Sequence, residues 1–324
     1  SLSGLSFSDY LGIHPRLVDN SNMGGSSFQS HALLAALALA AGQCDVALIA
    51  YASNQRSTSG KLTRTSRTSP WEVPYRPMPP ISSYALAAAR HMHQYGTTKE
   101  QLGEVAVAAR KWAQLNPDAF MREPLSMEDY LKSRLVCDPF GVRDCCLVTD
   151  GAAAAVMVRA DRARDLCKRP AYLLGAGTEI THRQIASMPD LTVTGAAGAA
   201  RRAFAQAGVK PADIDVVELY DAFTINTILF LEDMGFCPKG EGGRFVAGGA
   251  IAPGGRLAVN TNGGGLSCVH PGMYGLFTIV EAAQQVMHAA GERQIPNARL
   301  AVAHGNGGEL SSEGVLVLGA AETL

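Results

Sequence analysis

Paired cysteine motifs are missing from this chain. Its seven cysteines are scattered, with no C-x-x-C pair and no histidine at a metal-ligand spacing. A structural zinc site is therefore not expected, and isolated thiols in odd number are typical of reduced cysteines in a cytoplasmic protein. We predict no metal site and a cytoplasmic location.

Long apolar runs and an excess of charge are missing too. The Ala-rich stretch 32–41 is followed at once by the polar residues 42–45, so it is too short for a membrane span. The formal net charge is -1, and neither nucleic acid nor a membrane surface is an expected partner. Residues 1–4 lack the basic region and the apolar core of a secretory signal.

What the chain does have is length and an alternating pattern. Its 324 residues, 47% of them hydrophobic, suffice for two units that each bury a core. Short apolar runs at 171–174, 215–219, 299–303 and 314–318 alternate with helical patterns. This alternation predicts an α/β fold in which helices cover a mixed sheet. The run 45–51 is almost continuously apolar, as in a strand buried on both faces.

Two glycine-rich turns read almost alike. Residues 20–27 are Asn-Ser-Asn-Met-Gly-Gly-Ser-Ser, and residues 260–267 are Asn-Thr-Asn-Gly-Gly-Gly-Leu-Ser. A short apolar segment, predicted to be a strand from residue 17 in the first copy, precedes each turn, and a long helical pattern follows. The duplication predicts one fold unit used twice, with a site where the two turns face each other.

The segment 53–140 has a different character. Two capping boxes, Thr98 with Gln101 and Ser126 with Asp129, predict that helices begin inside it. We predict an inserted, mostly helical loop domain at 53–140, between an N-terminal half at 1–52 and 141–165 and a C-terminal half at 166–324. In that second half the glycine-dense stretch 240–255 predicts a loop or a set of tight turns.

Several ordered motifs carry a family resemblance. They are Tyr-Gly-Thr-Thr-Lys-Glu-Gln-Leu at 95–102, Asn116-Pro117, Asp-Cys-Cys-Leu-Val-Thr-Asp-Gly-Ala at 144–152, Glu-Leu-Tyr-Asp-Ala-Phe-Thr at 218–224, and Gly263–Gly265 with His270-Pro271-Gly272. In their order and spacing the whole chain resembles the thiolase superfamily, and in particular its sterol-carrier or lipid-transfer-type branch.

The resemblance implies a duplicated five-layer αβαβα fold with an inserted loop domain, usually as a homodimer. It also implies that a further strand–helix stretch precedes the first glycine turn in chains of this family. Only the end of that stretch fits ahead of Val18, so we expect an N-terminal segment that this sequence does not contain.

Both cysteines that thiolases use are absent. Asn22, Met23 and Gly24 stand where the nucleophile belongs, and residues 303–308 read Ala-His-Gly-Asn-Gly-Gly where the second thiol belongs. A packing role is expected for Cys268. Ser26 and Ser27 are expected to cap the following helix rather than to attack a substrate, because no base is visible to activate them.

An oxyanion-handling site remains. By the resemblance, His270 is the histidine that hydrogen-bonds the thioester oxygen, where charge develops as an enolate forms. Tyr220 stands where thiolases carry Asn and the sterol-carrier branch carries His. It either exchanges a proton with a substrate hydroxyl, which requires a shift of its ordinary pKa of about 10, or is a structural residue at a strand end.

Other candidate residues surround this pair. His304 is a further acid/base candidate or a packing residue. Asp221 either orients Tyr220 or caps the next helix, and capping is favoured. Backbone N–H groups are expected to form a second oxyanion hole at Gly24, Gly25, Gly305 and Gly307. A basic arm would meet the phosphates of coenzyme A, as the family's loop domain does, or lie solvated on the surface: Arg56, Lys61, Arg64 and Arg67.

The leading hypothesis is an enzyme that breaks a carbon–carbon bond beside a CoA thioester without an acyl-enzyme. Retro-aldol cleavage of a β-hydroxyacyl-CoA fits best, because no thiolate can carry an acyl group. Cysteine-less members of this branch resemble bacterial steroid side-chain aldolases, which work with a small OB-fold partner. The alternatives are acetyl-CoA acetyltransferase activity and a non-catalytic acyl-CoA- or lipid-binding subunit. No bound cofactor is expected, since the CoA thioester is the substrate.

Overall fold

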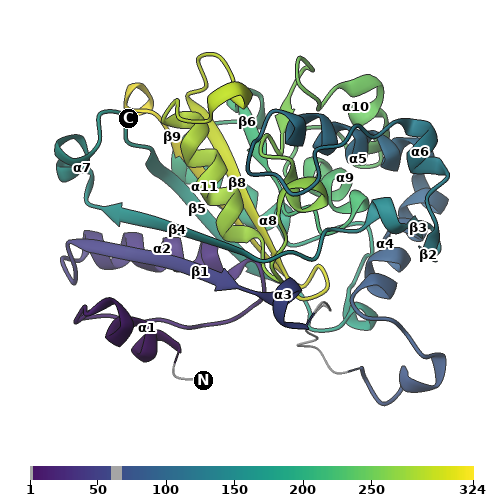
Figure 1. Cartoon of the computed structure of the whole chain (residues 1–324), viewed down its shortest axis with the longest axis horizontal. Helices are drawn as coiled ribbons and strands as arrows, with labels where there is room; N and C mark the ends of the chain where they lie inside the picture. The colour runs from purple at the N-terminus through teal and green to yellow at the C-terminus, as the bar shows by residue number, and fades with distance from the viewer. Residues whose placement is uncertain (1–2, 60–67) are drawn as a thin grey trace.

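The computed structural model describes residues 3–59 and 68–324 (Figure 1). Its α-helices in this part of the chain are α1 (Ser3–Leu11), α2 (Ser27–Ala40), α3 (Gln55–Ser59), α4 (Ile81–Tyr95), α5 (Lys99–Gln114), α6 (Met127–Leu131), α7 (Ala160–Leu166), α8 (Ala196–Ala207), α9 (Thr224–Asp233), α10 (Gly242–Val246) and α11 (Gly275–Val286). Its strands are β1 (Val46–Ser53), β2 (Leu135–Cys137), β3 (Phe140–Gly141), β4 (Gly151–Val158), β5 (Tyr172–Ile180), β6 (Val216–Glu218), β7 (Ala258–Val259), β8 (Leu300–Gly307) and β9 (Ser312–Gly319). No helix described here is long and apolar enough to cross a bilayer.

A five-stranded mixed sheet forms the centre, in the order β5-β9-β8-β6-β7. β6 runs parallel to β7 and β8, whereas β9 is antiparallel to both β8 and β5. Side chains alternate along β9: Val315 and Val317 join one core cluster, and Leu316 and Leu318 join the other. Both faces of the sheet are therefore covered, as the apolar runs predict.

Helices cover the two faces of this sheet (Figure 1). α2 and α11 pack on one face and contact each other, and α8 with α9 covers the opposite face. Beyond α2 and α11 lies a second, two-stranded antiparallel sheet of β1 and β4, which α2 and α11 also contact. The order of layers is thus sheet, helices, sheet, helices, consistent with the predicted thiolase-like α/β fold.

The chain leaves the two-stranded sheet at Ser53 and returns at Gly151, and these two residues are register partners. The helices α3 to α6 and the β2–β3 ribbon lie between them. This course agrees with an insertion in the first half, although the three-part division of the chain stays a prediction. Both predicted capping boxes are present, at Thr98 with Gln101 and at Ser126 with Asp129.

Two local predictions were wrong and a third was wrong in part. Residues 17–20 form no strand, and Leu17 and Val18 are exposed. The glycine-dense stretch forms turns at 250–255 as expected, but it also contains a short helix, α10. β1 is not buried on both faces, because only one of its faces packs on α2 and α11, and Val46 and Leu48 on the other are 51% and 42% exposed.

Candidate active site

The two glycine turns share one local geometry. In the first, Asn22 Oδ1 accepts a hydrogen bond from the Gly24 N–H at 2.9 Å, and in the second Asn262 Oδ1 accepts one from Gly264 at 2.7 Å. An Asn side chain that bonds the backbone two residues on forms an Asx-turn. The duplicated sequence therefore repeats a physical device and not only a composition. The copies differ afterwards, because a π-turn at Gly264–Cys268 precedes α11.

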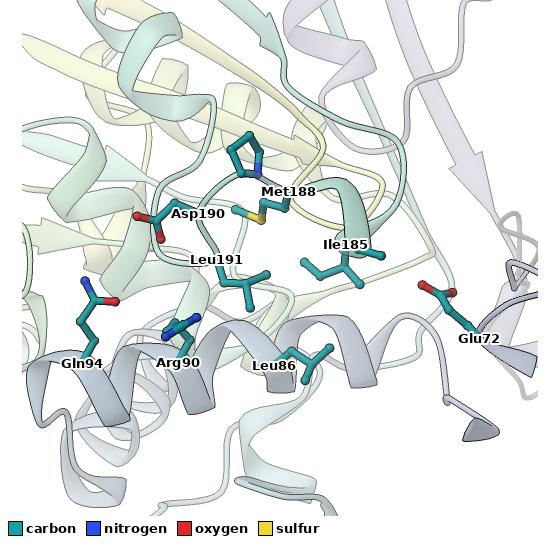
Figure 2. A pocket seen from close by; sticks show the side chains of 10 residues that line it. Glu72, Leu86, Arg90, Gln94, Ile185, Met188, Asp190 and Leu191 are labelled. Atoms are coloured by element: carbon teal, nitrogen blue, oxygen red, sulfur yellow. The ribbon is translucent and has the colours of Figure 1, made fainter. Parts of the chain in front are cut away.

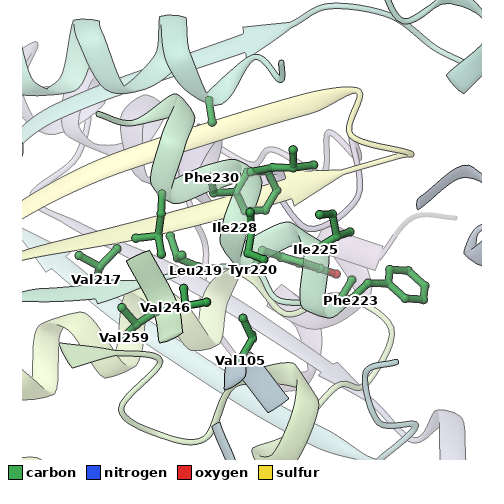
Figure 3. Packing of buried hydrophobic residues seen from close by; sticks show 14 of the residues in the cluster. Val105, Val217, Leu219, Tyr220, Phe223, Ile225, Ile228, Phe230, Val246 and Val259 are labelled. Carbon is green, nitrogen blue, oxygen red and sulfur yellow. The ribbon is translucent and has the colours of Figure 1, made fainter. Parts of the chain in front are cut away.

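Tyr220 lies where β6 has ended and α9 has not yet begun. It is 5% exposed, and its hydroxyl is 3.1 Å from Nε2 of His270. Its ring stands edge-on to Tyr274, with 5.7 Å between centroids. Figure 3 shows the ring among the apolar side chains around α9. Tyr220 and His270, which are 50 residues apart in the sequence, thus lie side by side in the structure.

His270 is held by its backbone. Its N–H donates to Thr149 Oγ1 at 3.0 Å, and the carbonyl of the next residue, Pro271, accepts from the Tyr51 hydroxyl at 2.6 Å. Its Nδ1 has no hydrogen-bond partner among the described residues although the side chain is only 5% exposed. A buried polar atom without a partner destabilises the folded state by about 1–3 kcal/mol.

The Tyr220–His270 pair is neutral at pH 7. Burial raises the pKa of the Tyr220 hydroxyl well above its ordinary value of 10.0, and Cys146 and Tyr84 raise it further. Burial also lowers the pKa of His270 from 6.5 to about 4. Both shifts have the same cause, since a low-dielectric interior disfavours either charged form. A downward shift that would make Tyr220 a phenolate base is therefore not what the site provides.

The first glycine turn packs directly against the last glycine loop. A Cβ on Gly24 would lie 2.9 Å from Cα of Gly307, and one on Gly25 would lie 2.6 Å from the Asn306 carbonyl oxygen and 1.9 Å from Cε2 of Tyr220. Only glycine fits at these positions. The structure thus brings Gly25 to the edge of the Tyr220 ring and Gly24 against Gly307, whereas Gly305 faces Gln29 of α2.

The proposed oxyanion donors are not equivalent. The Gly24 N–H is already bonded to Asn22. The Gly25 N–H is buried and makes no hydrogen bond with any described residue. Gly305 and Gly307 lie in β8 and pair with Gly314 and Ser312 of β9. Gly25 is therefore the donor that this geometry favours, and its role stays a proposal.

His304 sits behind Tyr220 rather than beside its hydroxyl. It is fully buried in β8, its Nδ1 is 3.5 Å from the Tyr220 backbone N–H, and its Nε2 is 3.0 Å from Oε2 of Glu313. Burial lowers its pKa to about 3 and raises the pKa of Glu313. His304 contacts the Tyr220 backbone, so a positioning role fits its place better than the predicted acid/base role.

Asp221 does not cap α9, contrary to the prediction. The residue at the start of that helix is Phe223, which provides no side-chain cap. Asp221 accepts hydrogen bonds from the backbone N–H groups of Gly265 at 2.6 Å and Leu266 at 3.4 Å. It thereby fixes the second glycine turn from the Tyr220 side. Burial raises its pKa from 3.8 to about 7.

Two further side chains build the site and were missed from the sequence. The hydroxyl of Tyr274, which is stacked near His270, donates to Asn262 Oδ1 at 2.8 Å. The hydroxyl of Tyr84, on α4, donates to the Gly308 carbonyl at 3.1 Å and accepts from Asn306 Nδ2 at 2.7 Å. Tyr274 comes soon after the His-Pro motif, but nothing in the sequence near Tyr84 links it to the last loop.

Burial disfavours the reactive thiolate form of three cysteines near the site, Cys145, Cys146 and Cys268. Cys268 is buried with Ala113 and Ala119, as expected for a packing residue, and burial raises its pKa to about 12. Burial likewise raises the pKa of Cys145 to about 12 and that of Cys146 above its usual range. Ser26 and Ser27 are not side-chain caps, because Ser26 Oγ donates to Ser312 and Ser27 Oγ to the Gly24 carbonyl.

Of the basic arm, the structure describes only Arg56. Its Nη1 donates to the Val148 carbonyl at 3.3 Å, and its guanidinium lies 4.6 Å from the centre of the Phe120 ring. The other predicted CoA-binding residues lie outside the described residues: Lys61, Arg64 and Arg67.

Comparison with known proteins agrees with this architecture. Residues 177–320 match the family model described as thiolase C-terminal domain-like. A 17-hydroxy-3-oxo-4-pregnene-20-carboxyl-CoA lyase of Mycobacterium tuberculosis is 37% identical over 273 residues, which cover 78% of this chain and 69% of the relative. The chain belongs to the thiolase superfamily.

Two further matches place this thiolase-like chain within the superfamily. An acetyl-CoA acetyltransferase of Methanothermobacter thermautotrophicus is 40% identical over 70% of this chain, which spans 60% of that relative. The solved structure of an Ltp2-ChsH2(DUF35) aldolase superposes with a TM-score of 0.89 at 31% identity, covering 99% of this chain and 84% of that one. The predicted lipid-transfer-type branch, with its steroid side-chain aldolases, is thus confirmed.

Proposed function

We propose that this thiolase-like protein cleaves the Cα–Cβ bond of a β-hydroxyacyl-CoA by a retro-aldol reaction without an acyl-enzyme. The observation that carries the proposal is the Tyr220–His270 contact of 3.1 Å, with His270 Nδ1 buried and unpartnered among the described residues. In this proposal Tyr220 faces the β-hydroxyl of the substrate and His270 Nδ1 faces the thioester oxygen, and both lie in one buried site. The lyase and aldolase names of the relatives support the same reaction class.

We propose a path for the proton that follows the Tyr220–His270 contact. Because Tyr220 and His270 are both neutral, Tyr220 gives its own proton to Nε2 of His270 while it takes the proton of the substrate's β-hydroxyl. The Cα–Cβ bond breaks, the β-carbon becomes a carbonyl, and the electron pair moves to the enolate of the CoA thioester. A proton relayed back through the same pair then protonates Cα and restores both residues to their neutral forms.

The same path fixes the tautomer of His270. An Nε2 that accepts a proton from Tyr220 must start without one, so the ring hydrogen is on Nδ1. That N–H is the atom without a partner among the described residues. We place the thioester oxygen there, with the Gly25 N–H as a second donor, because preorganised donors in a dry site stabilise developing charge strongly.

The substrate and partner proposals follow the relatives' names. The lyase of Mycobacterium tuberculosis is named for a pregnene carboxyl-CoA, and the solved aldolase is named as a complex with a DUF35 protein. We propose a steroid acyl-CoA as the substrate, a small OB-fold protein as the partner, and Arg56 as a contact to the CoA phosphates. A homodimer in the cytoplasm, with all seven cysteines free, completes the proposal.

The test supplies β-hydroxyacyl-CoA and β-ketoacyl-CoA thioesters to the protein, with and without the co-purified partner, and follows the free products. We expect release of the carbonyl product and the shortened acyl-CoA from the hydroxy substrate, and no acyl adduct on the protein by mass spectrometry. Thiolysis of the ketone with a detectable acyl adduct would show acetyltransferase activity instead. Saturable binding without turnover under any combination would show a non-catalytic acyl-CoA-binding subunit.

A matched pair of variants tests the role of Tyr220. Tyr220→Phe removes the hydroxyl of the relay, and we expect kcat to fall by about 10²–10⁴-fold, as for other lost acid–base groups. Tyr172→Phe is the control, since Tyr172 is also buried but lies in β5. Full aldolase activity in Tyr220→Phe would remove its assigned role.

A further inference from the structure

Two adjoining hollows open along α4, away from the Tyr220–His270 pair. One has a volume of about 540 Å³ and the other of about 220 Å³. They share Glu72, Leu86 and Ile185 as walls, so they form one groove between α4 and the segment 183–191. Figure 2 shows Leu86 and Arg90 projecting from α4 toward Ile185, Met188 and Leu191 on the facing segment.

The walls at the middle of the groove are mixed, because Leu86 and Ile185 are apolar and Glu72 carries a carboxylate. Leu86 is 52% exposed, although the other face of α4 is buried in the core. Tyr75, from the segment before α4, is 85% exposed and lines the smaller hollow. Large side chains left open around a concave surface of this volume are typical of a site for an apolar small molecule.

One end of the groove is polar. Arg90 makes no hydrogen bond or ion pair with the described residues, although its charge helps to lower the pKa of Asp190. Asp190 is itself occupied, because it accepts hydrogen bonds from the backbone and the hydroxyl of Thr192 at 2.8 Å each. A cation with free donors beside a satisfied carboxylate suits an oxygen atom of a ligand, such as a ketone or a carboxylate.

The other end reaches the last glycine loop. Ser83, which lines the smaller hollow, donates to Glu309 Oε2 at 2.6 Å. The next residue, Tyr84, bonds both Gly308 and Asn306, and the Asn306 carbonyl lies against Gly25 beside Tyr220. From Ser83, at the glycine-loop end of the groove, to Gln94, at its other end, the helix rises about 16 Å at 1.5 Å per residue.

We infer that this groove holds the apolar ring system of a polycyclic acyl group, with Leu86 against its face and Arg90 on an oxygen at its far end. This assignment rests on the proposed function, because the glycine loops then hold the thioester and the groove holds what the thioester carries. The groove makes Leu86 and Arg90 specificity-determining residues and gives them no part in bond cleavage.

The test compares Leu86→Asp with Ala89→Asp, an exposed position on the same helix that does not line the groove. The substrates are a steroid β-hydroxyacyl-CoA and 3-hydroxybutyryl-CoA. We expect Leu86→Asp to raise the KM for the steroid thioester about tenfold, the usual effect of losing one buried apolar contact, and to change the short substrate less than twofold. Ala89→Asp should change neither. Equal effects on both substrates, or equal effects of both variants, would overturn the assignment.

Binding separates this inference from the proposed function. Calorimetric titration of free CoA and of the steroid acyl-CoA without its β-hydroxyl, which cannot undergo retro-aldol cleavage, gives dissociation constants without turnover. Weaker binding of the steroid thioester alone in Leu86→Asp supports the groove even if wild type cleaves nothing, whereas unchanged binding refutes it. Arg90→Met gives a second reading: it should weaken a ring system with a far-end ketone more than its deoxy analogue, and equal loss for the two would remove the role of Arg90.

Discussion

Burial, rather than neighbouring charge, is the largest cause of the pKa shifts of Tyr220 and His270. Neither residue has a charged group within hydrogen-bond reach among the described residues, and each pKa shift has burial as its largest cause. A tyrosine in water next to a histidine would be a poor proton carrier with many competing partners. In this site the two side chains face each other in a buried interior, where fewer groups compete for their protons.

The neutral state of His270 predicts a flat pH profile. Because its pKa is lowered to about 4, the residue is uncharged throughout pH 5–8, and activity that needs neutral Nε2 is lost only as pH falls toward about 4. We expect kcat/KM for the hydroxyacyl thioester to show no acidic limb near 6.5 from this residue. A limb near 6.5 that disappears in His270→Asn would contradict the burial argument.

Gly25 occupies a position where a side chain would collide with the Tyr220 ring. In Gly25→Ala the new Cβ would lie 1.9 Å from Cε2 of Tyr220, so the ring must move. We expect kcat to fall at least about tenfold, because misplacing a reacting group by about 1 Å costs as much as 10²-fold. Gly195→Ala is the control, at φ -63° with its nearest contacts at 3.3 Å. Thermal melting of both variants checks that the fold is kept, and equal kinetics in the two would contradict the role.

At the scale of elements, the sequence predicts well whatever is encoded locally. Thr98 with Gln101 forms its capping box, and the runs at 215–219 and 299–303 become β6 and β8. Predictions that depend on a distant partner fare worse. Asp221 was expected to act on its own helix, but it bonds a turn 44 residues away in sequence. The contacts of Tyr84 with the last loop span more than 220 residues, and no local pattern reports them.

Asp221, just after β6, accepts hydrogen bonds from the second glycine turn. Because its pKa is raised, the contribution of this group to stability depends on pH. Its folded pKa is raised from 3.8 to about 7, so the folded state binds more protons than the unfolded state between these values. Stability from this group is full below pH 4 and is lost as pH rises through 7, by up to about 1.4 kcal/mol per pH unit. We expect Asp221→Asn to flatten the dependence of Tm on pH between 5 and 8. A variant with the wild-type slope would show that another group causes it.

At the scale of the molecule, the described residues cover the β1–β4 sheet on one side only. Ala47 and Ile49 of β1 pack on the α2–α11 layer, whereas Val46 and Leu48 point away from it. Leu48 is the register partner of Val156, which is 66% exposed. The continuously apolar sequence of β1 therefore does describe a strand with two apolar faces.

This open apolar face, together with the edges of the two-stranded sheet that pair with no other described strand, predicts self-association. Exposed strand edges and contiguous apolar surface favour pairing with another chain, and the family resemblance implies a homodimer. We expect sedimentation velocity to show a dimer that Val156→Lys converts to monomer, because a buried, unpaired lysine is strongly disfavoured. Leu166→Lys is the matched control, since Leu166 is 64% exposed but lies on α7. A monomer at every concentration, or the same loss of dimer in Leu166→Lys, would contradict an interface on the β1–β4 face.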